Sequence, residues 1–357
     1  MTPCDPPLAP YAFPTAQTQG RLYPEPPHPY RGAFQRDRDR IIHCAAFRRL
    51  SEKMQVFTAE FGNYHRTRLT HTMEVVGVAR TIGRVLRLNE DLIEAAALLH
   101  DIGHSPFGHA GEAVLDRLLQ DCGGFDHNAQ ALRIVEKLER RYSNFPGLNL
   151  SREILDGQAY KIAKTGIPLL EIQVVDIADS IAYDTHDVDD AMEIGLLMTE
   201  QPMETSLWKR SARKVRAQWA NLNDAEFRRA VVHDLIETQV SDLLQAAMQR
   251  LEGITSRADA LTVPMIVPSA EIAEQKREMQ RFLLEHVYRH PNVLIHRRRV
   301  ADWLEMIFGR YMSQPELLPE RYGVVIQREG VCRAAGDYIA DQTDRSIRAQ
   351  TQQERLV

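Results

Sequence analysis

Apolar residues recur every three or four positions through most of this chain, which is the spacing of an amphipathic helix. Residues 65–86 show the pattern with an apolar stripe that includes Leu69, Met73, Val76 and Ile82. The same spacing predicts further helices over residues 36–50, 90–101, 127–140, 168–186, 204–220, 224–252, 268–289 and 297–312, with loops at 57–64 and 144–149. Strand patterns are sparse, and only the loop over residues 255–268 could include a short extended piece. The pattern therefore predicts an all-α protein with one large helical body.

The first 33 residues differ from the rest because prolines interrupt them, including Pro-Pro pairs at 6–7 and 26–27. We expect a Pro-rich N-terminal arm over residues 1–33, without the basic-then-apolar pattern of a signal peptide. The alternating charges of Arg36 to Arg40 are interpreted as the solvated first turn of the helix that follows. No apolar run approaches the roughly 20 residues that a membrane helix requires, so no membrane association is expected.

Composition adds few constraints: 44% of the 357 residues are hydrophobic, 26% are charged, and the formal net charge is −5. This is typical of a soluble globular protein with no net attraction to phosphate polymers, so anion binding must come from local clusters. The four cysteines, Cys4, Cys44, Cys122 and Cys332, contain no Cys-x-x-Cys pair. Their scatter predicts neither a disulfide framework nor a zinc ribbon, and favours a reducing, cytoplasmic setting.

Residues 98–112 stand out because they concentrate ionisable side chains directly after an apolar helical run at 95–99. His100 and Asp101 follow this run at the end of the same predicted helix, which is expected to break at Gly103. An imidazole nitrogen and a carboxylate directed at one point suit a hard-to-borderline divalent cation.

A second helix is expected to follow at once, with Ser105 as its N-cap and Pro106 as its first residue. His109 and Glu112, three positions apart, would then share one face. Together with His104, these side chains would be costly to bury unless a metal ion or a substrate compensates them. The whole segment therefore predicts a functional site.

Two other predicted helices carry ionisable residues between apolar flanks. His71 lies near the start of the helix at 65–86, and residues 168–186 are interrupted by Glu171, Asp176, Asp179 and Asp184. Three helices could thus direct side chains at one point, as helix bundles do when they build metal sites. A near-octahedral cation used in phosphate chemistry needs a few protein ligands and room for water and substrate. The expected ligands are His71, His100, Asp101 and Asp179, for a divalent metal ion such as Mg, Mn, Fe, Ni or Co.

The order His … His-Asp … Asp is the pattern of the HD phosphohydrolase superfamily, and longer segments make the resemblance more specific. Residues 34–57, 65–75, 98–112, 125–136 and 173–191 together resemble the deoxyguanosinetriphosphate triphosphohydrolase (dGTPase) family. DYIADQTDR at 337–345 resembles that family's C-terminal signature, although Asp341 and Gln342 stand where Gly and Met are common. The resemblance implies an HD-domain helical bundle extended by further C-terminal helices, with a catalytic core over 34–200 and a packed helical region over 201–357.

The resemblance also implies metal-dependent hydrolysis of deoxynucleoside triphosphates, dGTP or others, to deoxynucleoside and intact triphosphate. His109 and Glu112 match the family's catalytic pair, in which Glu112 would orient or charge-stabilise His109. His109 would then act on the attacking water or on the leaving 5′-oxygen. His127 matches a further active-site histidine found in some members, and His104 stands at a position that varies within the family.

The resemblance also implies which residues of this chain would contact the substrate. Arg68 matches a phosphate-binding arginine, and Gln55 matches a residue near the sugar and base. Tyr183 and Asp187 follow Asp179 at four and eight residues and so share its helix face. In the family these two lie beside the deoxyribose, where the ring would crowd a 2′-hydroxyl and the carboxylate would accept from the 3′-hydroxyl.

Several alternatives stay open. Another HD reaction, such as hydrolysis of a nucleotide monophosphate or a cyclic phosphodiester, would use similar ligands, and a dNTP-binding sensor would use them without turnover. The basic runs Arg48-Arg49 and 296–299 are interpreted as solvated helix faces, although some family members bind single-stranded nucleic acid. Family precedent implies a homo-oligomer and a possible dNTP activator. The sequence leaves the base preference, the metal and the number of metal ions open.

Overall fold

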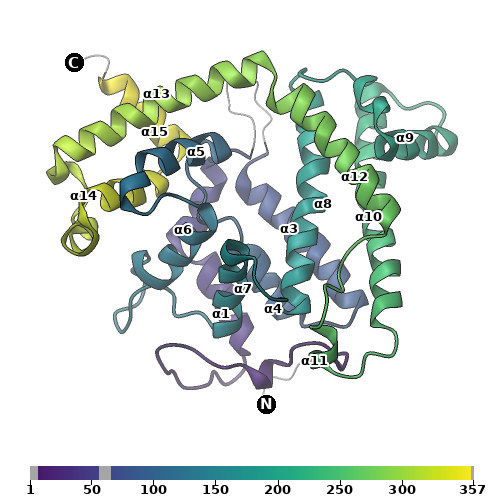
Figure 1. Ribbon diagram of the computed structural model, residues 1–357, viewed down its shortest axis with the longest axis horizontal. Helices are drawn as coiled ribbons and strands as arrows, with labels where there is room; N and C mark the ends of the chain where they lie inside the picture. Colours follow the sequence, from purple (N-terminus) through teal and green to yellow (C-terminus); the bar gives the residue numbers. More distant parts are fainter. Residues whose placement is uncertain (1–6, 56–65, 355–357) are drawn as a thin grey trace.

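The computed structural model describes residues 7–55 and 66–354, and these residues form helices and no β-strand (Figure 1). The α-helices are α1 (Ala33–Ile42), α2 (Ala45–Arg49), α3 (Arg68–Val85), α4 (Glu90–Leu99), α5 (Gly108–Leu118), α6 (His127–Arg133), α7 (Arg152–Ala163), α8 (Leu170–Glu193), α9 (Ser206–Gln218), α10 (Asp224–Leu251), α11 (Arg257–Ala260), α12 (Ala270–Leu283), α13 (Pro291–Ser313), α14 (Gly323–Ala340) and α15 (Asp344–Glu354). Shorter helical turns are η1 (Thr15–Gln17), η2 (Leu50–Glu52), η4 (Gln120–Cys122), η5 (Ile134–Leu138), η6 (Gln201–Glu204), η7 (Leu284–Tyr288), η8 (Pro315–Leu317) and η9 (Glu320–Tyr322). The all-α prediction is confirmed.

Several predicted boundaries were wrong, each for a local reason. The expected helix start at Pro106 moves to Gly108, because Phe107 adopts a left-handed conformation with φ 62° at the N-cap. The helix expected over 127–140 ends at Arg133 and continues only as a π-helical turn. The extended piece expected within 255–268 is absent, and this loop contains the short helix α11 instead. The loop predicted at 57–64 lies outside the described residues.

The main core lies among α3, α4 and α8, with α1 and α10 packed around them (Figure 1). α4 is rich in alanine and leucine and is buried on nearly all sides, with Ala95, Ala97 and Leu99 almost inaccessible. Small side chains let the neighbouring helices approach closely. Gly83 of α3, for example, contacts Ile93 of α4, and a Cβ added to Gly83 would lie 2.3 Å from Cδ1 of Ile93. The end of α4 is thereby held rigidly in the middle of the protein.

The C-terminal helices pack against α5 and form a second apolar cluster with it. In Figure 1, α13, α14 and α15 gather around α5. Asp344, at the start of α15, accepts hydrogen bonds from the backbone N–H groups of Phe107 at 2.8 Å and Met54 at 3.2 Å. Nζ of the buried Lys53 donates to the carbonyls of His104 at 2.6 Å and Ala340 at 2.8 Å. The C-terminal segment therefore fixes the loop that joins α4 to α5.

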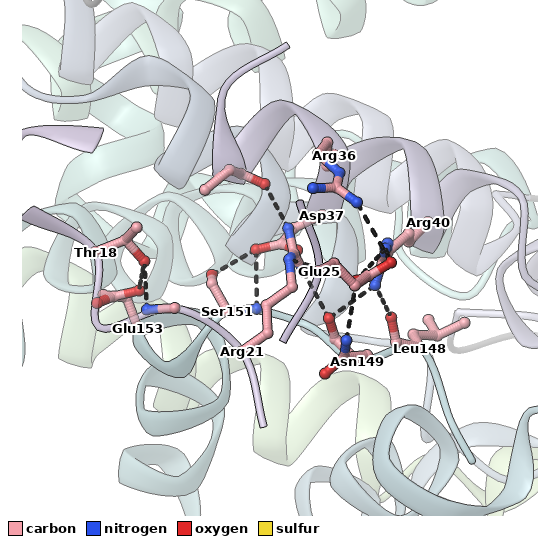
Figure 2. A network of polar contacts seen from close by, with 12 residues as sticks. Thr18, Arg21, Glu25, Arg36, Asp37, Arg40, Leu148, Asn149, Ser151 and Glu153 are labelled. Carbon is pink, nitrogen blue, oxygen red and sulfur yellow. Dashed lines mark hydrogen bonds and ion pairs between the residues drawn. The ribbon is translucent and has the colours of Figure 1, made fainter. Parts of the chain in front are cut away.

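The N-terminal arm lies against α1 through the polar network of Figure 2. Arg21 forms an ion pair with Asp37, whose carboxylate also accepts from the Ser151 backbone N–H at 3.1 Å. Arg40 donates to the Leu148 carbonyl at 2.7 Å and pairs with Glu25 at 2.7 Å. The interpretation of residues 36–40 as a solvated turn was therefore wrong, because Asp37 is 0% and Arg40 only 6% exposed.

The cysteines also depart from expectation, because Cys122 and Cys332 form a disulfide across a sequence separation of 210 residues. α14 returns to the end of α5, so two residues that share no local motif become neighbours. Cys44 is a buried free thiol, and Cys4 lies outside the described residues. None of the described helices combines the length and apolar character needed to cross a bilayer. The expected division near residue 200 stays a prediction.

Candidate active site

Three helices bring His71, His100 and Asp179 together. His71 comes from the first turn of α3, His100 from the end of α4 and Asp179 from the middle of α8. Nε2 of His71 lies 3.0 Å from Oδ1 of Asp179, and Nε2 of His100 lies 3.7 Å from the same oxygen. One ligand atom from each residue lies within 4.8 Å of the others, a spacing that could hold a metal ion.

The ring of His100 is already set for ligation. Its Nδ1 lies 2.6 Å from the Ala97 carbonyl oxygen, which can only accept, so Nδ1 carries the proton and Nε2 presents a lone pair. Nε2 is buried and has no hydrogen-bond partner among the described residues. Because a buried polar atom without a partner is costly, this nitrogen suits a site that a cation completes.

Asp101, the fourth expected ligand, lies at the edge of this group. Its Oδ1 is 3.7 Å from His100 Nε2 and 3.2 Å from His104 Nε2, while its Oδ2 accepts from the Arg68 guanidinium at 2.8 Å. Burial alone would raise the pKa of Asp101, but Arg68 and the two histidines outweigh it and hold the pKa well below its ordinary value. Asp101 therefore stays an anion next to the site.

Asp179 is an anion for a similar reason. Burial would raise its pKa, but the neighbouring His100, His71 and Lys161 lower it below the ordinary range. Burial also lowers the pKa of His100, which favours the neutral imidazole that metal binding requires. Asp179 and His100 therefore have the charge states that a divalent cation needs. Burial would lower the pKa of His71, but the hydrogen bond to Asp179 outweighs it and raises this pKa, so His71 would release a proton when a cation binds.

Gly103 explains how the turn after α4 reaches this place. A Cβ at Gly103 would lie 2.0 Å from the His127 carbonyl oxygen and 2.3 Å from the Ala131 backbone nitrogen. Only glycine lets the turn lie directly on α6. This close approach also brings His127 toward His104, and their rings stack with centroids 3.9 Å apart.

A second cluster centres on Glu112. Its Oε2 lies 2.9 Å from His109 Nδ1, and its Oε1 lies 2.7 Å from His127 Nδ1 and accepts from the His127 backbone N–H at 2.9 Å. Burial would raise the pKa of Glu112, but the bonds to His109 and His127 lower it well below its ordinary value. One carboxylate thus orients two imidazoles. His109, with a 54% exposed side chain, is the more accessible of the two, since the His127 side chain is 21% exposed.

Both clusters open onto a cavity of about 810 Å³. Most of the residues predicted from the sequence line it: Gln55, Arg68, His71, His100, Asp101, His104, His109, His127, Asp179 and Tyr183. Glu112 lies behind His109 and is not part of the wall. Asp187 is also absent from the wall, because it is fully buried and accepts a hydrogen bond from the Tyr288 hydroxyl. Its predicted contact with a sugar stays a prediction.

The cavity also contains residues that sequence reasoning missed, chiefly from α7. Tyr160, Lys161 and Lys164 line one side, and Lys161 pairs with Asp176 of α8 at 2.9 Å. Asn128 at the start of α6 and Ser180 of α8 also line the cavity. The charged side chains of the cavity wall are the acids Asp101, Asp126, Asp176 and Asp179 and the cations Arg68, Lys161 and Lys164. This mixture suits an anionic ligand that is bound through a metal ion.

Comparisons with known proteins agree with this geometry. The family model of the HD domain matches residues 68–184, and the model of the phosphohydrolase-associated domain matches residues 266–353. A protein of Geobacter sulfurreducens named "deoxyguanosinetriphosphate triphosphohydrolase-like protein" is 41% identical over 355 residues, covering 95% of this chain and 92% of its own. The chain belongs to the dGTPase-like family.

Other dGTPase-like relatives match equally broadly. Proteins of the same name from Thiobacillus denitrificans and Leptospira interrogans are 41% and 40% identical, covering 96% and 95% of this chain and 95% and 93% of their own. A solved structure of a hypothetical protein from Aquifex aeolicus aligns at 16% identity with a TM-score of 0.37 over 85% of this chain and 66% of that one, too weak a likeness to add to the assignment. The predicted family is confirmed, and it is a family of HD phosphohydrolases.

Proposed function

We propose that this protein hydrolyses deoxynucleoside triphosphates to deoxynucleoside and triphosphate. In this proposal His71, His100, Asp101 and Asp179 hold a divalent cation. The observation that carries the proposal is the unpaired, buried Nε2 of His100, directed at His71 and Asp179 beside a cavity that is large enough for a nucleotide. The dGTPase-like names of the relatives support the choice of substrate.

A bound divalent cation would polarise a phosphate oxygen and offset part of the charge of the triphosphate. The chain supplies further positive charge through Arg68, whose buried guanidinium is already oriented by Asp101 at 2.8 Å. Lys161 and Lys164 line the same cavity from α7. Together these cations would bind the triphosphate of a nucleotide, and the neutral nucleoside would face the rest of the cavity wall.

His109 is the residue placed to move a proton. Because Glu112 accepts from Nδ1, the other ring nitrogen of His109 is free to take a proton from an attacking water or to give one to the leaving 5′-oxygen. Glu112 would stabilise the imidazolium that forms. His127, held by the same carboxylate, and His104, stacked on His127, would restrict how far His109 can turn.

Tyr183 supports a preference for deoxyribose. Its ring lines the cavity with its centroid 6.5 Å from that of His109, so a sugar next to the reacting phosphate would lie against the ring. An additional 2′-hydroxyl would meet this aromatic wall without a hydrogen-bond partner. Binding of a ribonucleotide would therefore be weakened by the free-energy cost of desolvating that hydroxyl.

The test is product analysis with the purified full-length protein in Mn²⁺ or Mg²⁺. Each of the four dNTPs should be supplied alone and in mixtures, so that activation by a second nucleotide is also detected. Tripolyphosphate and deoxynucleoside in equal amounts would support the proposal. Orthophosphate from a monophosphate would favour another HD reaction, and dNTP binding without product would favour a sensor.

Two variants link the activity to the site. Asp179→Ala should lose metal and turnover together, whereas Glu112→Gln should keep the metal and lose most turnover. Full turnover in both variants would refute the assignment of these residues.

A further inference from the structure

His186 of α8 is buried against His71 and has no assigned role. Nδ1 of His186 lies 3.3 Å from Nδ1 of His71, and the two rings meet edge to face with centroids 5.5 Å apart. Both side chains are almost inaccessible, at 2% and 1% exposure. The contact is therefore on the side of the His71 ring that faces away from Asp179.

The other nitrogen of His186 faces a carboxylate of α3. Nε2 of His186 lies 3.3 Å from Oε2 of Glu74, and the Arg66 guanidinium donates to the same oxygen at 3.0 Å. Glu74 has a 45% exposed side chain, so this end of the chain of contacts reaches solvent. A continuous line thus runs from the surface through Glu74 and His186 to His71.

Metal binding at His71 would determine which ring nitrogen donates a proton and which accepts one along this series of contacts. A histidine that ligates through Nε2 keeps its proton on Nδ1. In His71 that proton points at Nδ1 of His186, which must then accept. The neutral ring of His186 consequently carries its own proton on Nε2, which lies 3.3 Å from the Glu74 carboxylate.

We propose that His186 and Glu74 are positioning residues, which hold His71 in the tautomer and the orientation that a divalent cation requires. This inference rests on the proposed function, because it assumes that His71 is a ligand. His100 differs from His71 in this respect, because the Ala97 backbone carbonyl sets its ring. His71 is therefore the histidine ligand whose orientation can be changed by substituting another side chain.

The test compares two substitutions of different chemistry at one position. In His186→Asn the side-chain Oδ1 stays close to the place of Nδ1 and can still accept from His71. In His186→Leu the acceptor is lost while the side chain stays apolar and of similar size. Thr185→Val is the matched control, because Thr185 is also buried on α8 but bonds to the Ile181 carbonyl instead of to His71.

The readout is the affinity of the full chain for Mn²⁺ alone, measured from the electron paramagnetic resonance signal of free Mn²⁺. His186→Leu should raise the Kd for Mn²⁺ by roughly 10- to 100-fold, as loss of partners behind metal ligands commonly does. His186→Asn should stay within about threefold of the wild type, and Thr185→Val should match the wild type. Thermal unfolding in EDTA should give similar midpoints for the Asn and Leu variants, which separates metal binding from stability.

The inference is overturned if His186→Leu binds Mn²⁺ as tightly as the wild type, or if His186→Asn binds as weakly as His186→Leu. Should His186→Leu fail to fold, Glu74→Leu applies the same test from the half-exposed end, and unchanged affinity there would also overturn it. The variant Asp179→Ala distinguishes a failure of the proposed function from a failure of this inference alone. A wild type that binds no Mn²⁺ defeats the proposed function as well, whereas binding that depends on Asp179 but not on His186 or Glu74 defeats only this inference.

Discussion

Replacing Glu112 by glutamine tests the catalytic cluster most directly, because the two side chains have the same shape and differ in what their ends can accept. Glu112 accepts three hydrogen bonds, one at Oε2 from His109 at 2.9 Å and two at Oε1 from the ring and backbone of His127 at 2.7 and 2.9 Å. A glutamine has only one oxygen. That oxygen should remain toward His127, where two donors converge, and the amide NH₂ should then face His109.

The consequence is a change of tautomer. Facing an NH₂ donor, Nδ1 of His109 must become an acceptor, and its proton moves to the nitrogen that had been free to act as a base. Loss of a positioned acid–base group commonly lowers rates by roughly 10²- to 10⁴-fold, or about 2.7–5.5 kcal/mol. We expect a decrease of this size in kcat for Glu112→Gln. The Kd for Mn²⁺ at the site of His71, His100 and Asp179 should not change, because Glu112 lies outside this group. Glu112 belongs instead to two neighbouring groups with ligand-like spacing, one with His104 and His109 and one with Asp126 and His127, so only a weaker second site could be affected.

The assay is release of tripolyphosphate from saturating dNTP, with Mn²⁺ affinity measured on the same samples. The double variant His109→Ala/Glu112→Gln adds a second check, because residues that act through one another are not additive. It should be no slower than His109→Ala alone. Turnover of Glu112→Gln within about threefold of the wild type, or fully additive losses in the double variant, would refute the coupling of these two residues.

Three further predictions concern stability. Gly103→Ala should lower the free energy of unfolding, measured by urea titration, by about 1–3 kcal/mol, because the new Cβ would lie 2.0 Å from the His127 carbonyl oxygen. Gly77→Ala is the control and should not destabilise the protein, because nothing lies within 4 Å of its Cβ. Burial raises the pKa of Asp187 from 3.8 to about 8, so between these values the folded state keeps a proton that the unfolded state has lost, and wild-type stability falls as pH rises. Asp187→Asn removes this dependence, and its advantage in Tm over the wild type should grow between about pH 5 and pH 8; a constant difference would contradict the shifted pKa. Removing metal with EDTA should lower Tm, and Mn²⁺ at about 100 times its Kd should restore about 2.7 kcal/mol in the wild type and nothing in Asp179→Ala, as followed by calorimetry.

The local pattern of the chain was sufficient for the helices that build the core and for the order of the candidate ligands. α3, α4, α8 and α10 were expected because helical periodicity depends only on near neighbours in the sequence. α7 was not expected, since Gly157 lies at its centre. That glycine meets Ile172 of α8, where an added Cβ would lie 2.5 Å from Cδ1, so the helix depends on a contact with another element. Lys161 was missed together with α7.

By itself, the sequence determined which side chains of the site exist and on which helices they lie, because spacing along one helix sets which face each residue occupies. Only the tertiary structure decided which of them meet. The contacts of His186 with His71, of Glu112 with His127 and of Asp344 with Phe107 join residues 115, 15 and 237 positions apart, and no local pattern encodes them. The disulfide between Cys122 and Cys332 has the same origin. Such contacts arise from the packing of whole helices, and in this protein they set the protonation and orientation of the groups that would do the chemistry.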